Sequence, residues 1–181
     1  MSRDTGVHHV AYTCHDLDAT VHFYEDLVGL PLVHTEVKHL GDGFFRHVFF
    51  ALGDGSALAF FDLHGVGEKP DWSSDLNAST GAPGWANHLA LGVDAARMEE
   101  VRGRMKAAGV PVVMEVDHGW CHSLYYADPD NLLVELCCDT PGFDPDADEA
   151  HRLLDSDTDT DVSRFIGDTP DEIKALAELM G

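Results

Sequence analysis

The sequence predicts an α+β fold that consists of two copies of one βαβββ module. The segment "HVAY" begins at His9, and the similar segment "HLAL" begins 79 residues later at His88. Each copy is followed by a helix-like stretch and then by matching segments, "GLPLV" at 29–33 and "GVPVV" at 109–113. Self-similarity at a fixed period of this size indicates a duplicated structural unit.

The first module is expected over residues 6–63. Its first strand is expected at 7–14, in a β-rich run that alternates loosely between apolar and polar residues. Asp16 is a suitable N-cap for a helix that ends near Val28, and Gly29 suits the position just past a helix end. Three more strands are expected at 32–38, 44–51 and 57–63, with "GDG" turns at 41–43 and 53–55 between them.

The second module, expected over residues 86–138, repeats this order. A strand is expected at 87–93, and a helix at 94–108 that ends before Gly109. The remaining strands are expected at 112–116, 123–127 and 132–138. The linker at 64–85 is rich in glycine, proline, serine and aspartate, which predicts a loop that could cover the mouth of a pocket.

Residues 1–139 are therefore expected to form a single domain, followed by an acidic extension at 140–181. The extension has twelve acidic and three basic residues, a composition typical of a solvated segment. A short helix is predicted within it, because Thr169, Pro170 and Glu172 fit the N-cap, first and third helical positions. The apolar residues of this helix could pack on the domain or on a partner.

Composition excludes several classes of function. A formal net charge of −22 would repel the phosphates of nucleic acids and of anionic lipids. There is no run of 18 or more apolar residues, and the N-terminus lacks the apolar core of a secretion signal, so a cytoplasmic protein is expected. Adjacent Cys137 and Cys138 lie in an apolar strand, which is typical of small hydrophobic residues rather than of a disulfide framework.

Three residues indicate a metal site: His9, His88 and Glu135. A single histidine in a strand is most often a core residue, but these two occupy equivalent positions of the repeat. Glu135 lies in the apolar run "LLVEL", where a carboxylate is costly to bury unless it is paired or binds a metal. Two imidazoles and one carboxylate form the ligand set of non-haem iron(II) oxygenases. His8 is the rival of His9, but strand alternation predicts that it points to the opposite face.

With these residues the chain resembles the vicinal oxygen chelate superfamily, which includes glyoxalases, epimerases, fosfomycin-resistance proteins and type I extradiol dioxygenases. The resemblance covers about residues 6–139. It implies that the paired modules form a cupped, barrel-like mixed sheet around a divalent metal ion. It also implies that the ligands come from the first and last strands of the modules, at the positions of His9, His88 and Glu135.

The stretch "HGWCHSLYYADPDNLLVE" resembles the signature of the type I extradiol dioxygenases. The signature positions are filled by His118, Leu124, Tyr125, Asp128, Pro129 and Glu135. The resemblance implies that His118 is an acid or base and that Tyr125 forms a hydrogen bond to the metal-bound substrate. His122 is the alternative to His118. Asn131 stands where the signature prefers glycine or proline.

Two further positions bear on the reaction. Ala59 aligns with Glu135, so the fourth ligand of glyoxalases and many epimerases is missing, and the nearest carboxylate, Asp62, is expected on the other face of its strand. The ring-cleaving enzymes also have a pocket histidine near the position of Gly55 and Ser56. His47 or His39 could take its place.

The resemblance therefore implies an Fe(II)-dependent dioxygenase that cleaves a catechol-like aromatic substrate with dioxygen. One alternative is a glyoxalase-like or epimerase-like lyase or isomerase that uses Mn²⁺, Zn²⁺ or Ni²⁺. Another is a metal-free protein that binds an aromatic compound, as bleomycin-resistance proteins do. A homodimer is expected, and the phenylalanines at 44, 45, 49, 50, 60 and 61 are expected in the core and the pocket wall.

Overall fold

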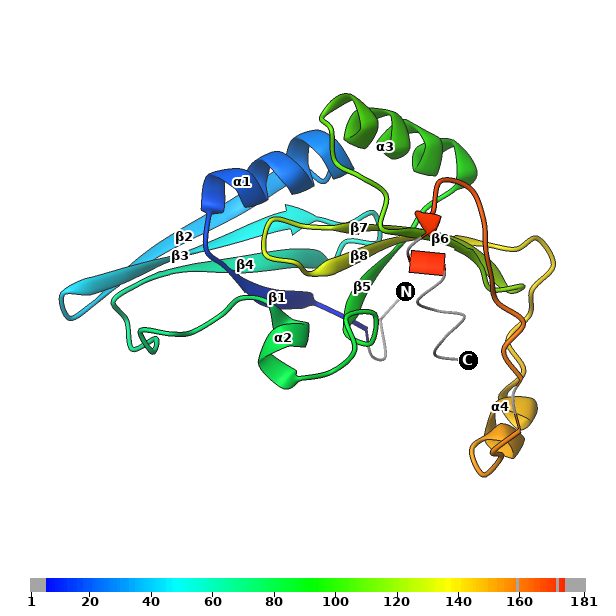
Figure 1. The fold of residues 1–181 in the computed structure, drawn as a ribbon. Coiled ribbons are helices and arrows are strands. Elements are labelled where there is room, and N and C mark those ends of the chain that lie inside the picture. The colour runs from blue at the N-terminus through cyan, green and yellow to red at the C-terminus, as the bar shows by residue number, and fades with distance from the viewer. Residues whose placement is uncertain (1–5, 159, 172, 175–181) are drawn as a thin grey trace. The chain divides into compact units, whose positions relative to one another are not determined.

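The computed structural model describes residues 6–158, 160–171 and 173–174, and it confirms the predicted α+β class with two mixed sheets and several helices (Figure 1). The first sheet has the strand order β1 (His9–Cys14), β4 (Ala57–His64), β3 (Gly43–Ala51), β2 (Leu32–Leu40). The second has the order β5 (His88–Gly92), β8 (Leu133–Asp139), β7 (Cys121–Ala127), β6 (Met114–Asp117), β9 (Arg164–Phe165). Among the described residues, no helix is long and apolar enough to cross a bilayer.

The chain divides into two compact units. The first comprises residues 1–88, 101–109 and 127–133, and the second comprises residues 89–100, 110–126 and 134–181. The helices are α1 (Leu17–Val21), the π-helix η1 (His22–Val28), α2 (Leu76–Thr80), α3 (Ala95–Ala107) and α4 (Ala147–Leu153).

The first helix begins and ends where the sequence predicts. The Asp16 carboxylate accepts a hydrogen bond from the Ala19 amide at 3.0 Å, and Gly29 follows the helix with a left-handed φ of 83°. The C-terminal half is wound as a π-helix instead of the predicted α-helix. Its wider turn buries two adjacent pairs of side chains, Phe23 with Tyr24 and Leu27 with Val28. The guanidinium of Arg104 caps this end by donating to the carbonyls of Leu27 and Val28.

The strand register shows which side chains share each face of the first sheet. His9 of β1 lies opposite Ala57 of the parallel strand β4, and along the antiparallel strand β3 His47 lies opposite both Phe61 and Glu36. Because side chains alternate along a strand, one set of residues shares a face, which we call the histidine face. The histidine face consists of His9, Ala59, Phe61, Phe49, His47, His34 and Glu36. The other face is core, where Tyr24 packs on Phe60 and Phe50 with ring centroids 4.8 and 5.7 Å apart.

The hairpin between β7 and β8 explains the departure from the signature at Asn131. Asn131 has a φ of 61° and is the one non-glycine residue with a positive φ in the described part of the chain. Glycine suits this conformation best, and asparagine is among the residues that tolerate it. The Asp128 carboxylate holds the turn by accepting the amides of Asp130 and Leu132 at 2.8 and 2.9 Å.

Three elements of the structure were not predicted from the sequence. The linker at 64–85 contains the short helix α2, which Asp75 caps by accepting the Ala78 amide at 2.8 Å. The extension contains α4 and β9, neither of which was expected. The proposed capping box stays a prediction, because its member Glu172 lies outside the described residues, as do the apolar positions 176, 177 and 180. The buried hydroxyl of Thr169 bonds to the backbone of Glu115.

Candidate active site

His9 begins β1 and is exposed on the histidine face. Its ring centroid lies 5.6 Å from that of Phe49 and 6.1 Å from that of His47. The prediction that His8 points to the opposite face is wrong, since its Nδ1 lies 2.8 Å from the Nδ1 of His9. The reason is that β1 starts only at His9, so the alternation of the strand does not extend back to His8.

Of the two candidates for the missing pocket histidine, His47 lies near His9, whereas His39 packs against Phe44 with ring centroids 5.8 Å apart. His47 is 9% exposed and stacks on Phe61 at 3.8 Å. Its Nδ1 lies 4.0 Å from a Glu36 oxygen, and its buried Nε2 has no hydrogen-bond partner among the described residues. Burial lowers the pKa of His47, Glu36 partly offsets that effect, and the nearby His9 and His34 lower it further.

Ala59 is fully buried in β4 opposite Ala11 and Phe49, and its methyl group offers no donor atom to a metal. Asp62 follows Ala59 by three positions in β4 and lies opposite Cys14. Because side chains alternate along a strand, this odd spacing confirms that Asp62 lies on the other face of the sheet. There its carboxylate accepts a hydrogen bond from Arg46 at 2.7 Å and lies 2.8 Å from His64. The first sheet therefore supplies no carboxylate from β4 on the face that His9 occupies.

His88 begins β5 and is exposed. Its Nδ1 lies 3.0 Å from the carbonyl oxygen of Trp85, so this nitrogen must carry the ring proton and donate it. The lone pair of the neutral ring is then on Nε2. Histidines that bind metals commonly donate their other N–H to a carbonyl in this way.

Glu135 is central in β8, the strand beside β5, and is 5% exposed. The Ser123 hydroxyl of β7 donates a hydrogen bond to its carboxylate at 2.5 Å. Ser123 lies outside the set of residues predicted from sequence. The alternation in "CHSLYY" was the available signal, because it places Ser123 on the same face of β7 as Tyr125.

The structure brings together two of the three predicted catalytic residues, His118 and Tyr125. The His118 Nε2 lies 3.1 Å from the Tyr125 hydroxyl, and its Nδ1 lies 2.7 Å from the hydroxyl of Ser163 in the extension. Burial raises the pKa of Tyr125, and the negative charge of Glu135 raises it further. The phenol therefore remains protonated at neutral pH.

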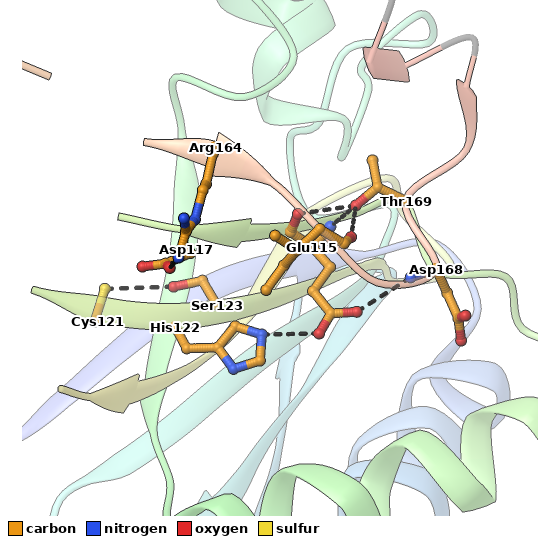
Figure 2. Close-up of polar contacts among 9 residues, drawn as sticks. Glu115, Asp117, Cys121, His122, Ser123, Arg164, Asp168 and Thr169 are labelled. Carbon is orange, nitrogen blue, oxygen red and sulfur yellow. Dashed lines mark hydrogen bonds and ion pairs between the residues drawn. The ribbon is translucent and has the colours of Figure 1, made fainter. Parts of the chain in front are cut away.

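The alternative residue, His122, is engaged elsewhere. It alternates with Tyr125 along β7 and so projects from the opposite face, where its Nε2 lies 2.8 Å from a carboxylate oxygen of Glu115. Figure 2 shows that Glu115 also accepts the amide of Asp168, while its backbone bonds to Thr169. Glu115, the partner of His122, is thus the residue that binds the extension to β6.

A second group of possible metal donors lies around Glu135. The thiols of Cys121 and Cys137 and the carboxylate of Glu135 each offer a ligand atom, and these atoms lie within 4.8 Å of one another. All four cysteines are free thiols. Cys137 is therefore more than the small hydrophobic residue that the sequence indicated, because it lies beside two other possible metal donors.

The chain is similar to several known proteins. Residues 6–136 match the model of the Glyoxalase/Bleomycin resistance protein/Dioxygenase superfamily. A protein of Vibrio parahaemolyticus described as a probable lactoylglutathione lyase is 30% identical over 124 residues, which cover 67% of this chain and 81% of that protein.

Solved structures share the fold at lower identity. A glyoxylase/bleomycin resistance protein/dioxygenase domain from Frankia sp. has a TM-score of 0.58 and 20% identity, covering 77% of this chain and 95% of that one. A mutant of the fosfomycin resistance protein FosX from Listeria monocytogenes, complexed with Mn(II) and a dihydroxypropylphosphonic acid, has a TM-score of 0.55 and 21% identity, covering 77% and 96%.

Proposed function

The chain belongs to the glyoxalase/bleomycin resistance protein/dioxygenase superfamily, and from this premise we propose that it is a metal-dependent dioxygenase that cleaves a catechol-like ring in the extradiol manner. The contact between the His118 imidazole and the Tyr125 hydroxyl, 3.1 Å apart, supports this proposal most directly. The extradiol signature implies that these two side chains act on the substrate. Both lie in the second unit, which also contains Glu135.

The proposed metal ligands are His9, His88 and Glu135. The hydrogen bond from His88 Nδ1 to the Trp85 carbonyl suits ligation through Nε2. The burial of Glu135 suits a ligand because a bound cation offsets the cost of burying its charge. When bound, Fe²⁺ supplies sites for two vicinal substrate oxygens and redox chemistry with dioxygen. Mn²⁺, Zn²⁺ and Ni²⁺ are the alternatives.

The protein's own groups have separate tasks in this scheme. Tyr125 stays protonated because burial and Glu135 raise its pKa, so its hydroxyl can donate a hydrogen bond to a substrate oxygen. His118 can take up or return a substrate proton at Nε2, because an imidazole nitrogen can act as a general acid or base. The hydroxyl of Ser163, 2.7 Å from Nδ1, holds the His118 ring in one orientation.

The histidine face suits an aromatic substrate. Phe49 and Phe61 are half-buried there, close to His9 and His47. Aromatic side chains favour offset or edge contacts with another ring. Because Ala59 cannot bind a metal, the position of the fourth ligand is open. This favours a reaction that needs several vacant coordination sites on the metal.

A lyase or isomerase of the glyoxalase kind is the second candidate. The 30% identity to a probable lactoylglutathione lyase favours it. Such an enzyme would use a redox-inert metal, and it would need a base opposite the substrate. Binding of an aromatic compound without metal is the third possibility. The expected homodimer and the cytoplasmic location stay predictions.

The test is an activity assay on protein loaded anaerobically with Fe²⁺. The expected result is oxygen uptake that depends on a catechol and yields a yellow ring-opened product. The variant His118→Gln should lose most of this activity, whereas His39→Gln should retain it. Turnover of lactoylglutathione with Ni²⁺ or Zn²⁺, without oxygen uptake on iron, would replace the proposal with the second candidate.

A further inference from the structure

Two thiols flank the carboxylate of Glu135 in the second unit. Cys121 of β7 is fully buried, Glu135 of β8 is 5% exposed, and Cys137 of the same strand is half-buried. Their three donor atoms lie within 4.8 Å of one another. Thiols are readily buried, whereas a buried carboxylate is costly unless it is hydrogen-bonded or binds a cation, and the two thiols place further donor atoms beside it.

Strand alternation explains why these residues meet. Cys121 and Ser123 are two positions apart in β7, and Glu135 and Cys137 are two positions apart in the neighbouring strand β8. Ser123 lies between them and donates a hydrogen bond to Glu135 at 2.5 Å. Its hydroxyl also lies 3.5 Å from the Cys121 sulfur (Figure 2). The cluster therefore belongs to the regular part of the sheet, where the backbone ladder fixes the positions of its members.

We propose that Cys121, Glu135 and Cys137 form a binding site for a thiophilic divalent cation, of which Zn²⁺ and Cd²⁺ are the representatives. Thiolate ligands select such ions, and zinc–sulfur and zinc–oxygen bonds of about 2.3 and 2.1 Å require only a modest closure of the donor atoms. On binding, each thiol releases its proton to solvent and donates a sulfur lone pair. Three protein ligands leave a fourth tetrahedral position for water or a small ligand.

Occupation of this site has a consequence for Glu135. If the proposed function is correct, Glu135 is also a ligand of the iron centre, and one carboxylate cannot fully serve both sites. A thiophilic cation at the two cysteines then withdraws Glu135 from the His9 and His88 set. Zn²⁺ would inhibit the iron enzyme by this route without entering the iron site.

The test is a titration of reduced, chelator-treated protein with Cd²⁺, followed by the ultraviolet charge-transfer absorption of cadmium thiolate. The expected result is saturation at one Cd²⁺ per chain. The band should be lost in Cys121→Ser and Cys137→Ser, and retained in Cys14→Ser and Cys138→Ser. Cys138 is the matched control because it neighbours Cys137 in β8 and is also half-buried.

Two further measurements keep the outcome clear. Cd²⁺ should protect Cys137 from alkylation more than Cys138, which tests the site in the wild-type chain if Cys121→Ser does not fold. His9→Ala should leave the Cd²⁺ band unchanged, which separates this site from the proposed iron centre. Absence of a stoichiometric band, or a band that survives loss of either Cys121 or Cys137, would overturn the proposal.

Discussion

Tyr125 and Tyr126 are neighbours along β7, but their surroundings differ. Tyr125 lies beside His118 and Glu135, whereas Tyr126 is buried on the opposite face of the strand. The extradiol signature identified Tyr125 from sequence, because an acidic residue and proline follow it at fixed spacing. Strand alternation could have placed Ser123 on the face of Tyr125, but the sequence could not indicate Ser163, because its contact with His118 depends on how the extension packs.

Tyr125→Phe is expected to lower kcat/KM for ring cleavage by about 100-fold, the usual cost of removing one positioned hydrogen-bond donor. The effect should fall mainly on kcat if the hydroxyl acts on the developing charge. Tyr126→Phe is the matched control, because it removes a hydroxyl from the other face of the same strand. Steady-state kinetics of both variants provide the measurement, and equal losses would count against a catalytic Tyr125.

Asp128 illustrates how a structural carboxylate responds to pH. Burial raises its pKa above the ordinary 3.8, although Tyr24 and the amides of Leu132 and Asp130 lower it in part. The folded protein therefore keeps this proton at pH values at which the unfolded chain has lost it. The stability that Asp128 contributes is complete below pH 3.8 and is lost as the pH rises through the folded-state pKa.

Asp128→Asn does not titrate, so it should gain in unfolding free energy relative to the wild type as the pH rises through this window. Chemical denaturation of both proteins at a series of pH values measures the difference. A difference that stays constant or shrinks with rising pH would show that burial does not control this carboxyl.

Glu115 and Glu135 show that one sequence pattern can have two structural causes. Each is a carboxylate in an apolar strand, and each is nearly fully buried. The prediction of a buried carboxylate that needs a partner was made for Glu135 alone, and its burial and its bond from Ser123 confirm that part. The pattern could not distinguish a metal ligand from an anchor, because the partners of Glu115 lie in β7 and in the extension (Figure 2).

The extension is held to β6 as an added strand. In the antiparallel pair of β9 with β6, Arg164 lies opposite Asp117, and its guanidinium binds that carboxylate at 2.7 Å. A strand of two residues has no period for sequence to reveal, so β9 was not predictable from hydrophobic pattern. Because Ser163 precedes β9 and contacts His118, the extension links edge pairing to the candidate active site.

Gly167→Ala is expected to loosen the extension, because a Cβ at this position would clash with the Glu115 carboxylate and the residue also has a φ of 59°. Gly142→Ala is the matched control, since Gly142 has a φ of 87° but no atom within 4 Å of the added Cβ. Hydrogen exchange of the Ile166 amide, which donates to the Glu115 carbonyl at 2.9 Å, should accelerate only in Gly167→Ala. Equal exchange in the two variants would contradict the anchoring role of Glu115.

The repeat was the most informative feature of the sequence for the whole molecule. It predicted two βαβββ modules and the glycines that end the helices at 29 and 109. It could not predict α2, α4 or β9, because the linker and the extension lie outside the repeated part. Nor could it supply distances between donor atoms on strands far apart in sequence, so the ligand set of His9, His88 and Glu135 stays a prediction.

The most direct test of that ligand set is the iron content of protein loaded anaerobically with Fe²⁺ and then freed of loosely bound ions. The account predicts one Fe²⁺ per chain in the wild type and in Cys121→Ser/Cys137→Ser, and loss of iron in His9→Ala, His88→Ala and Glu135→Ala. His39→Ala, which alters a histidine near Phe44, should retain it. Full iron content in any of the three ligand variants, or none in the wild type, would contradict the account.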